Sequence, residues 1–249
     1  MSILKDKVAI VTGAGSGIGK AIAELYASNG ARVIVSDINE QAAKATVETI
    51  KAAKGTASFV KADSSLAEDN DKLVRDAVQQ YGALHIACNN AGIGGPSAPI
   101  GEYPVDGWQK VININLSGVF YGMRYQIPAM LKSGGGAIVN MASILGQVGF
   151  AQSCAYVAAK HGVVGLTRNA ALEYSNKGIR VNAIGPAFID TPLLSAMKPE
   201  QKQALISLHP IGRLGRAEEV AELALWLSSD KASYVSGSYY PIDGGYLSQ

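Results

Sequence analysis

The sequence predicts an α/β fold: a doubly wound, parallel sheet of seven strands with helices on both faces, formed as a single domain by residues 1–249. Two observations predict it. Short apolar runs typical of buried strands alternate with longer segments of helical period along the whole chain. In addition, no linker or low-complexity segment divides the 249 residues, a length that fits one large domain. Because right-handed crossovers join consecutive parallel strands, helices should cover both faces of the sheet.

The first two strand–helix pairs show this alternation most clearly. Val8–Val11 is an uninterrupted apolar run, and in the following segment, Ile18–Asn29, apolar residues recur every three or four positions. A second strand at Ala31–Ser36 leads into a helix at Asn39–Lys54, which an asparagine cap opens and Gly55 closes. Each pair therefore has the length and pattern of a β-α unit.

The same pattern continues to the end of the chain. Further strands are expected at Ala57–Lys61, Leu84–Cys88, Ala137–Met141, Arg180–Ile184 and Ser238–Ile242. Further helices are expected at Leu66–Tyr81, about Pro104–Leu131, about Cys154–Ser175 and Ala217–Ser228, with a loop and a short helix near Thr191–Leu208. Alternation of this kind is typical of βαβ crossovers.

Charge and cysteine content narrow the classes of function. The 22 Lys+Arg residues nearly balance the 20 Asp+Glu, and the net charge of +2 provides no field that would attract nucleic acid or an anionic membrane. Residues 77–101 and 133–159 contain no Asp, Glu, Lys or Arg, but glycine and polar residues interrupt both, so they fit buried strands and a cleft. Cys88 and Cys154 are expected to be reduced thiols. We therefore expect a cytoplasmic protein without a nucleic-acid or membrane partner.

A glycine-rich segment, Thr12–Gly19, joins the first strand to the first helix. Its glycines are spaced Gly-x-x-x-Gly-x-Gly, which lets the backbone turn sharply and approach a pyrophosphate resting on the free N–H groups of the helix N-terminus. The alternative is a glycine-rich turn without a ligand. The succession of strand, turn and amphipathic helix favours nucleotide binding.

Asp37 ends the second strand, 18 residues after Gly19. A carboxylate at about this distance accepts hydrogen bonds from the ribose hydroxyls of a dinucleotide and repels the 2′-phosphate of NADP. No Arg or Lys precedes Lys20 in the loop to bind such a phosphate. The pattern favours NAD as coenzyme, the alternative being that Asp37 only caps the helix that follows.

Tyr156 and Lys160 stand four positions apart on one predicted helix, so their side chains lie on the same face. An ammonium group beside a phenol favours the phenolate, and we expect Lys160 to lower the pKa of Tyr156 from its reference value of about 10. Such a tyrosine can take a proton from an alcohol or give one to a ketone oxygen. Alone, this spacing usually means two solvated side chains, but Ser143 upstream, in a stretch without charges, favours chemistry.

Taken together, these motifs resemble those of the short-chain dehydrogenase/reductase family over nearly the whole chain. The residues that carry the resemblance are Thr12–Gly19, Asp63, Asn89–Gly92, Asn115, Ser143, Tyr156, Lys160 and Asn182–Thr191. The resemblance implies a Rossmann fold and a nicotinamide-dependent oxidoreductase with a catalytic tetrad of Asn115, Ser143, Tyr156 and Lys160.

The resemblance also implies a role for each member of the tetrad. Tyr156 would act as acid or base, and Ser143 would hold the substrate oxygen. Lys160 would tune the tyrosine and bind the nicotinamide ribose, while Asn115 would break its helix locally and anchor a proton-relay water. The alternatives are that Asn113 takes the place of Asn115 and that Ser143 only caps a turn.

The family pattern further implies which residues contact the coenzyme: Gly13, Ser16, Gly17, Ile18, Gly19, Asp37, Asp63, Ser64, Asn90, Ala91, Gly92, Tyr156, Lys160, Pro186, Ile189 and Thr191. Asp63 would bind the adenine amino group, or else cap the next helix, and Ile189 and Thr191 would contact the nicotinamide carboxamide. The sequence departs from the family at Ala187, where a glycine is usual. Because alanine tolerates a positive φ poorly, a different pocket shape is expected beside the nicotinamide.

The walls of the substrate pocket are expected to be Gly94, Ile144, Leu145, Gln152, Cys154, Phe188, Leu193, Leu194 and Met197, with residues 187–212 as a substrate loop. Because these residues are mainly apolar and the loop offers an anion only Lys198 and Lys202, we expect a neutral secondary alcohol or ketone, of cyclic or aromatic type. One alternative is 3-oxoacyl-carrier-protein reduction, which would favour NADPH. Another, from a different class, is a non-catalytic NAD-binding regulator, since a fold does not fix a function.

Expectations about assembly and metals follow from the same resemblance. The helices near Gln109–Leu131 and Cys154–Ser175 carry more apolar positions than one sheet face covers, and the resemblance implies that they pair in a homotetramer. In some relatives the C-terminal carboxylate, here that of Gln249, binds a structural magnesium ion. No other metal site is expected, because the sequence gives His161 and His209 no ligand partners.

Overall fold

A computed structural model of the chain describes residues 2–194 and 197–248, except for the side chain of Leu193. Seven parallel strands form one sheet in the order β3-β2-β1-β4-β5-β6-β7. The strands are β1 (Val8–Thr12), β2 (Arg32–Asp37), β3 (Thr56–Lys61), β4 (Ile86–Asn89), β5 (Gly136–Met141), β6 (Ile179–Pro186) and β7 (Tyr239–Ile242). The helices are α1 (Gly17–Ser28), α2 (Glu40–Ala52), α3 (Ala67–Tyr81), α4 (Val105–Ile112), α5 (Gly118–Lys132), α6 (Cys154–Tyr174), α7 (Pro199–Ser207) and α8 (Ala217–Ser228).

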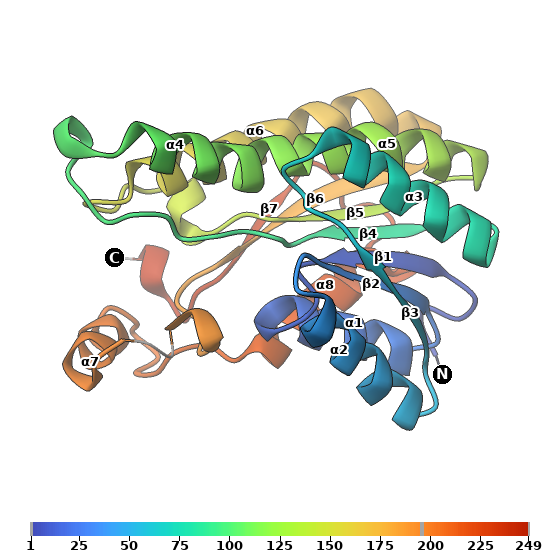
Figure 1. The fold of residues 1–249 in the computed structure, drawn as a ribbon, viewed down its shortest axis with the longest axis horizontal. Helices are drawn as coiled ribbons and strands as arrows, with labels where there is room; N and C mark the ends of the chain where they lie inside the picture. The colour runs from blue at the N-terminus through green and yellow to red at the C-terminus, as the bar shows by residue number, and fades with distance from the viewer. Residues whose placement is uncertain (1, 195–196, 249) are drawn as a thin grey trace.

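The sheet lies between two layers of helices, as predicted. Figure 1 shows α1, α2 and α8 on one face and α3, α5 and α6 on the other. Strand β1 explains why both faces are covered: Ala9 and Val11 belong to the apolar core under α1 and α8, while Ile10 belongs to the core under α3 and α5. Because successive side chains of a strand point to opposite faces, a run that is apolar throughout needs helices on both sides.

The order of the strands places a site at one edge of the sheet. Strands β1 and β4 are neighbours, but the chain continues from β1 towards β3 on one side and from β4 towards β7 on the other. The carboxyl ends of β1 and β4 therefore flank the switch point, where open α/β sheets bind their ligands. The hydroxyl of Thr12 accepts hydrogen bonds there from the backbone N–H groups of Asn90 and Ala91, at 3.0 and 3.1 Å, and joins the two strand ends.

Two details concern the helices predicted from the sequence, and only the second differs from the prediction. The helix predicted over about Pro104–Leu131 is divided by the local break that the family pattern implies, because a π-helical segment at Asn113–Ser117 separates α4 from α5. Gly55 does not close α2: the helix ends at Ala52, and Lys54 adopts the left-handed conformation, with a φ of 63°. Gly55 instead allows a close approach, since a Cβ there would lie 2.8 Å from Ile50 Cγ2.

The segment between β6 and α8 lies apart from the sheet. It contains the short turn Pro192–Leu194 and helix α7, both beside the carboxyl edge and near the C-terminus in Figure 1. Within residues 2–194 and 197–248, every helix is too short or too polar to cross a membrane.

Candidate active site

The glycine-rich loop turns from β1 into α1 with conformations that require glycine. Gly13 and Gly17 have φ values of 63° and 53°, a region that residues with a Cβ rarely adopt. A side chain at Gly13 would come within 2.9 Å of Ala91 Cα, and one at Gly19 would overlap the carbonyl oxygen of Gly13. No side chain caps the start of α1, so its first N–H groups are available to an anion.

Asp37 is held at the end of β2 by two backbone groups. One carboxylate oxygen accepts a hydrogen bond from Gly15 N at 2.9 Å, and the other accepts one from Asn39 N at 2.8 Å. The cap of α2 is Asn39, whose side chain accepts from Ala42 N at 3.1 Å. Asp37 is therefore not the helix cap, and its oxygens keep lone pairs for hydroxyl groups in the cleft.

Residues 90–92 pass directly over the loop. The amide of Asn90 donates to the carbonyl oxygens of Thr12 and Gly13, at 3.0 and 3.3 Å. Asp63 lies farther along the same edge, where one of its oxygens accepts hydrogen bonds from the N–H and the hydroxyl of Ser65 at 2.9 and 2.7 Å. Asp63 thus orders the turn before α3 and also lines the cleft.

Lys160 lies deep in the opposite wall. Its side chain, 3% exposed, donates from Nζ to the carbonyl oxygen of Met141 at 2.7 Å. A Cβ built on Gly92 would lie 3.2 Å from Asn115 Oδ1 and 3.8 Å from Lys160 Nζ, so Gly92 runs between these two residues. Burial without a carboxylate partner lowers the pKa of Lys160 to about 8.

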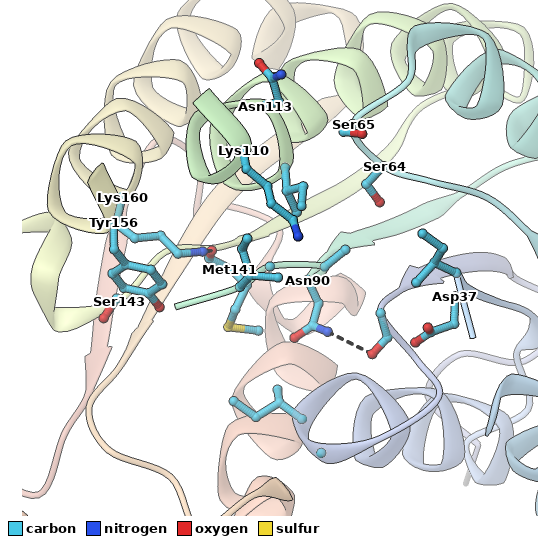
Figure 2. Close-up of a pocket in the computed structure, with 18 of the residues that line it drawn as sticks. Asp37, Ser64, Ser65, Asn90, Lys110, Asn113, Met141, Ser143, Tyr156 and Lys160 are labelled. Carbon is cyan, nitrogen blue, oxygen red and sulfur yellow. Dashed lines mark hydrogen bonds between the residues drawn. The ribbon is translucent and has the colours of Figure 1, made fainter. Parts of the chain in front are cut away.

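The side chains of Tyr156 and Ser143 lie next to each other and face the cleft together (Figure 2). Burial raises the pKa of Tyr156 above its ordinary value, and the neighbouring Ser143 hydroxyl only partly offsets the effect. The Lys160 ammonium lies 5.4 Å from the centre of the tyrosine ring. The expectation that Lys160 lowers the pKa of Tyr156 is therefore wrong for the chain without coenzyme, because desolvation of the phenol dominates.

Asn115 lies inside the π-helical segment, where the expected local break of the helix is confirmed. It is fully buried, and its amide makes a two-way clamp on Ile93: Oδ1 accepts from the backbone N–H at 2.9 Å and Nδ2 donates to the carbonyl at 2.8 Å. Asn113 instead lines the cleft and accepts a hydrogen bond from Gln109. The structure thus distinguishes the two asparagines, and Asn115 is the one beside Lys160.

These elements enclose an open cleft of about 860 Å³ at the switch point. Figure 2 shows its two ends: Ser143, Tyr156 and Lys160 on one side, and Asp37 and Ser64 on the other. The predicted site residues that it brings together are Gly13, Ser16, Gly17, Ile18, Asp37, Asp63, Ser64, Asn90, Ala91, Gly92, Ser143, Tyr156, Lys160, Pro186 and Thr191.

Three predicted coenzyme or catalytic residues lie outside the lining. Gly19 and Asn115 are packed behind it, as described above. Ile189 is buried, pairs with Gly215 in a short bridge and lines a separate cavity of about 170 Å³. Ala187, which stands where a glycine is usual, lines the cleft with a φ outside the left-handed region, so its methyl group causes no backbone strain there.

Of the residues predicted to contact substrate, those whose side chains the structure describes do not line the 860 Å³ cleft. Ile144 and Leu145 are buried in the turn after Ser143. Gln152 is exposed, has a φ of 65° and accepts a hydrogen bond from Ser97. Gly94 is exposed, whereas Cys154, Leu194 and Met197 are half-buried; the Leu193 side chain lies outside the described part of the chain, as does Gln249.

Phe188 belongs to an aromatic cluster that sequence analysis did not find. Its ring lies 5.9 Å from Phe150, 5.8 Å from His209 and 6.2 Å from Tyr246, measured between ring centres. The four rings come from separate segments of the chain, so no periodic sequence pattern connects them. His209 is therefore a packing residue: it is 4% exposed, and its Nδ1 lies 2.8 Å from the Leu205 carbonyl oxygen.

The side of the cleft formed by α4 was also missed. The lining residues not predicted from the sequence include Ile38, Ser65, Ile93, Asp106, Gln109, Lys110, Ile114 and Met141. The sequence contains a pattern that could have indicated this wall, since Asp106, Lys110 and Ile114 are spaced by four and so share one face of a helix.

Comparison with known proteins agrees with this geometry. A family model described as Enoyl-(Acyl carrier protein) reductase matches residues 13–247. The chain belongs to the short-chain dehydrogenase/reductase family. Cyclohexanol dehydrogenase of Acinetobacter sp. (strain SE19) is 51% identical over 244 residues, which cover 98% of this chain and 96% of that protein. The cis-4-hydroxycyclohexanecarboxylate dehydrogenase of Sinomonas cyclohexanicum is 43% identical, covering 97% of this chain and 96% of the relative.

A solved member of the family has the same fold. The crystal structure of levodione reductase superposes with a TM-score of 0.95 at 36% identity, covering 98% of this chain and 99% of the other. The Rossmann-like, seven-stranded fold predicted from the sequence is thus confirmed. The chain is an oxidoreductase of this family and uses a nicotinamide coenzyme.

The residues of the cleft fit such a coenzyme. The loop has no side chain at Gly13 and Gly17, so its backbone would let a diphosphate approach the start of α1. Asp37, fixed by two backbone N–H groups, presents acceptors at the end where ribose hydroxyls would lie. In the described ranges no three His, Cys, Asp or Glu side chains gather as metal ligands.

Proposed function

We propose that the chain is an NAD-dependent dehydrogenase/reductase of neutral cyclic secondary alcohols and ketones. The observation that carries the proposal is the cleft itself, which has Tyr156, Ser143 and Lys160 at one end and the fixed carboxylate of Asp37 at the other. An extended dinucleotide laid across the glycine-rich loop would place its nicotinamide near the tyrosine and its adenosine near the carboxylate.

A nicotinamide coenzyme held in the cleft would supply the hydride chemistry, as acceptor for alcohol oxidation and as donor for ketone reduction. Tyr156 moves the accompanying proton: its hydroxyl takes it from the alcohol or gives it to the ketone oxygen. Burial keeps the phenol protonated in the coenzyme-free chain, which suits ketone reduction directly. Alcohol oxidation requires the phenolate first, and the ammonium of Lys160 on the same helix face favours that form.

The remaining tetrad members position these two groups. The Ser143 hydroxyl accepts from Leu145 N at 3.2 Å and donates to the Pro186 carbonyl oxygen at 3.4 Å, and these two bonds hold it in place. To donate to the substrate oxygen it would give up the longer bond, because a hydroxyl has one proton. The Met141 carbonyl fixes Lys160, and the Asn115 clamp on Ile93 fixes the backbone beside Gly92. Asn115 is therefore proposed as a positioning residue.

The preference for NAD rests on Asp37. Its carboxylate would accept hydrogen bonds from both ribose hydroxyls, and its charge would repel a 2′-phosphate. Among the described lining residues, those at the end of β2 and in the glycine-rich loop include no Arg or Lys to offset that repulsion.

The substrate class rests on chemistry near Tyr156 and on the relatives. Phe188 and the other proposed substrate residues, Gly94, Ile144, Leu145, Gln152, Cys154, Leu194 and Met197, offer mainly apolar contacts and no charge. Lys202, one of two lysines in the substrate loop, is paired with Asp190 at 2.9 Å, which reduces the attraction for an anionic acyl carrier. The names of the relatives, a cyclohexanol and a hydroxycyclohexanecarboxylate dehydrogenase, favour a cyclic substrate.

A coenzyme and substrate panel tests the proposal. The purified protein should oxidise NADH with cyclohexanone and reduce NAD with cyclohexanol, and a linear ketone should be a poorer substrate. A preference for NADPH with an acetoacetyl thioester would instead support 3-oxoacyl-carrier-protein reduction. Tight NADH binding without turnover of any alcohol or ketone would support a non-catalytic regulator.

We also propose a homotetramer. Large apolar side chains remain exposed on α5 and α6, with Phe120 47%, Leu131 40% and Leu172 85% exposed. An apolar surface of this kind on adjacent helices is typical of an interface. Light scattering coupled to gel filtration should give four times the chain mass of 25.9 kDa, and a monomer would contradict the proposal.

A further inference from the structure

Helix α4 presents a polar stripe to the coenzyme cleft. Asp106, Gln109 and Lys110 of α4 line the cleft, while Val111, on another face of α4, is fully buried in a small apolar cluster with Ala155. In Figure 2 the side chain of Lys110 extends from its helix into the cleft, and its ammonium group is directed towards the region of Asn90. The stripe thus faces the glycine-rich loop from across the cleft.

Lys110 is one of two cations among the described residues that line the cleft. The described lining contains three carboxylates, Asp37, Asp63 and Asp106, but only Lys110 and Lys160 as cations. Lys160 is buried and committed to the Met141 carbonyl. The glycine-rich loop contains no cation, and Lys20, which follows it, lies 3.8 Å from Glu24. A dinucleotide brings a doubly charged diphosphate into this acidic surrounding.

The side chain of Lys110 can bind this negatively charged diphosphate. It is exposed, and none of its contacts in the described residues is an ion pair, although Asp106 lies one turn away on the same helix. A lysine side chain is long and flexible, and its ammonium group has three donors. The competing explanation is that Lys110, in the last turn of α4, only stabilises the helix dipole.

We propose that Lys110 folds over the coenzyme and binds its diphosphate from the α4 side, opposite the N-terminus of α1. The inference rests on the proposed coenzyme site and names a cation for it outside the glycine-rich loop. An exposed ion pair of this kind is weak, so removing it should raise the dissociation constant of NADH about 3- to 10-fold. The effect should also shrink in salt, because the pair is open to solvent.

Binding measurements test this without reference to turnover. Calorimetric titrations would compare the wild type with Lys110→Met, Lys110→Arg and Lys231→Met, using NADH, ADP-ribose and adenosine as ligands. Lys231 is exposed and does not line the cleft, so its variant controls for net charge. Lys110→Met should weaken NADH and ADP-ribose alike, leave adenosine unchanged and lose its effect near about 1 M salt, where charges are screened within about 3 Å. Lys110→Arg should restore most of the affinity.

Other outcomes would overturn the proposal in distinguishable ways. Equal affinities of wild type and Lys110→Met for ADP-ribose would show that Lys110 does not bind the diphosphate. An equal loss of affinity in Lys231→Met would show the same. An equal loss for adenosine, or a lower melting temperature of the coenzyme-free variant, would identify a structural role in α4. Failure of the wild type itself to bind ADP-ribose would instead refute the proposed coenzyme site.

Discussion

The two ends of the molecule's carboxyl edge are built differently. On the coenzyme side, the loop after β1, Asp37 after β2 and Asn90 after β4 are each held by hydrogen bonds to a neighbouring strand end or loop. On the proposed substrate side, Phe188 and His209 come from the long segment between β6 and α8, and ring contacts with Phe150 and Tyr246 bring them together.

This difference indicates which site residues are positioned by the order of the strands in the sheet. A residue that follows a strand has its position fixed by strand order, so its place in the cleft follows from its place in the sequence. A residue in a segment of more than twenty positions is placed by contacts with other loops, which no local pattern reveals. Substitutions on the two sides test this contrast, and the first changes Tyr156, the proposed proton donor and acceptor.

Tyr156→Phe should have the largest effect. Removing the hydroxyl removes the proton donor and acceptor, so kcat should fall about 10²- to 10⁴-fold. The dissociation constant of NADH should stay within a factor of about three, because the ring remains to pack in place. Stopped-flow turnover and fluorescence titration measure the two quantities, and full turnover by the variant would refute the assigned role of Tyr156.

Gly19→Ala should damage the coenzyme side through packing. The added methyl group would overlap the carbonyl oxygen of Gly13 and approach the Asn90 amide, so the loop must shift. Overpacking of this kind costs about 1 to 3 kcal/mol of stability, and NADH affinity should fall with it. Gly94→Ala is the matched control, because a Cβ there meets nothing within 4 Å. Equal unfolding curves for the two variants would show that the loop is less tightly packed than the structure indicates.

Asp37→Ala should change the choice of coenzyme. Hydrogen bonds to a charged group contribute about 1.5 to 3 kcal/mol, so kcat/KM for NAD should fall about 10- to 100-fold. Loss of the negative charge should at the same time raise kcat/KM for NADP. An unchanged ratio of the two values would mean that this carboxylate does not contact the ribose.

Lys160 predicts a pH dependence of stability. Its pKa is about 8 in the folded chain against a reference of 10.5, so the unfolded chain binds more protons between these values. The unfolding free energy of the wild type should therefore rise with pH across this window relative to Lys160→Met, by a few kcal/mol at most. Urea unfolding of both proteins at about pH 7 and pH 10 measures it, and a parallel response would contradict the burial of the charge.

Phe188→Ala should have the smallest effect and act on substrate alone. Each aromatic pair contributes about 0.5 to 1.5 kcal/mol, and their loss should loosen the loop beside the nicotinamide. KM for cyclohexanone should rise several-fold while the dissociation constant of NADH stays unchanged. An equal change in both would mean that the two sides of the edge are not independent.

The same contrast explains what the sequence could predict. Asp37, Asn90 and Tyr156 follow strands or share a helix face, and the structure brings all three to one cleft. The ring cluster around Phe188 was missed because it depends on how separate elements pack. The polar stripe of α4 has a visible spacing of four, but that spacing does not say which face of the helix meets the cleft. The pKa of Tyr156 was expected to fall and instead rises, because the side chain is buried. The sequence shows the spacing between Tyr156 and Lys160, but burial depends on the whole fold.

The π-helical turn at Asn113–Ser117 has a consequence for how this chain tolerates change in length. A π-helical turn holds about one residue more than an α-helical turn, so it takes up an extra residue while the helices before and after it keep their facing directions. Here Lys110 on α4 lines the cleft, and Met123 and Ile127 on α5 pack under the sheet. Deleting a single residue from this turn should therefore leave both faces in place but move Asn115 away from its hydrogen bonds to Ile93.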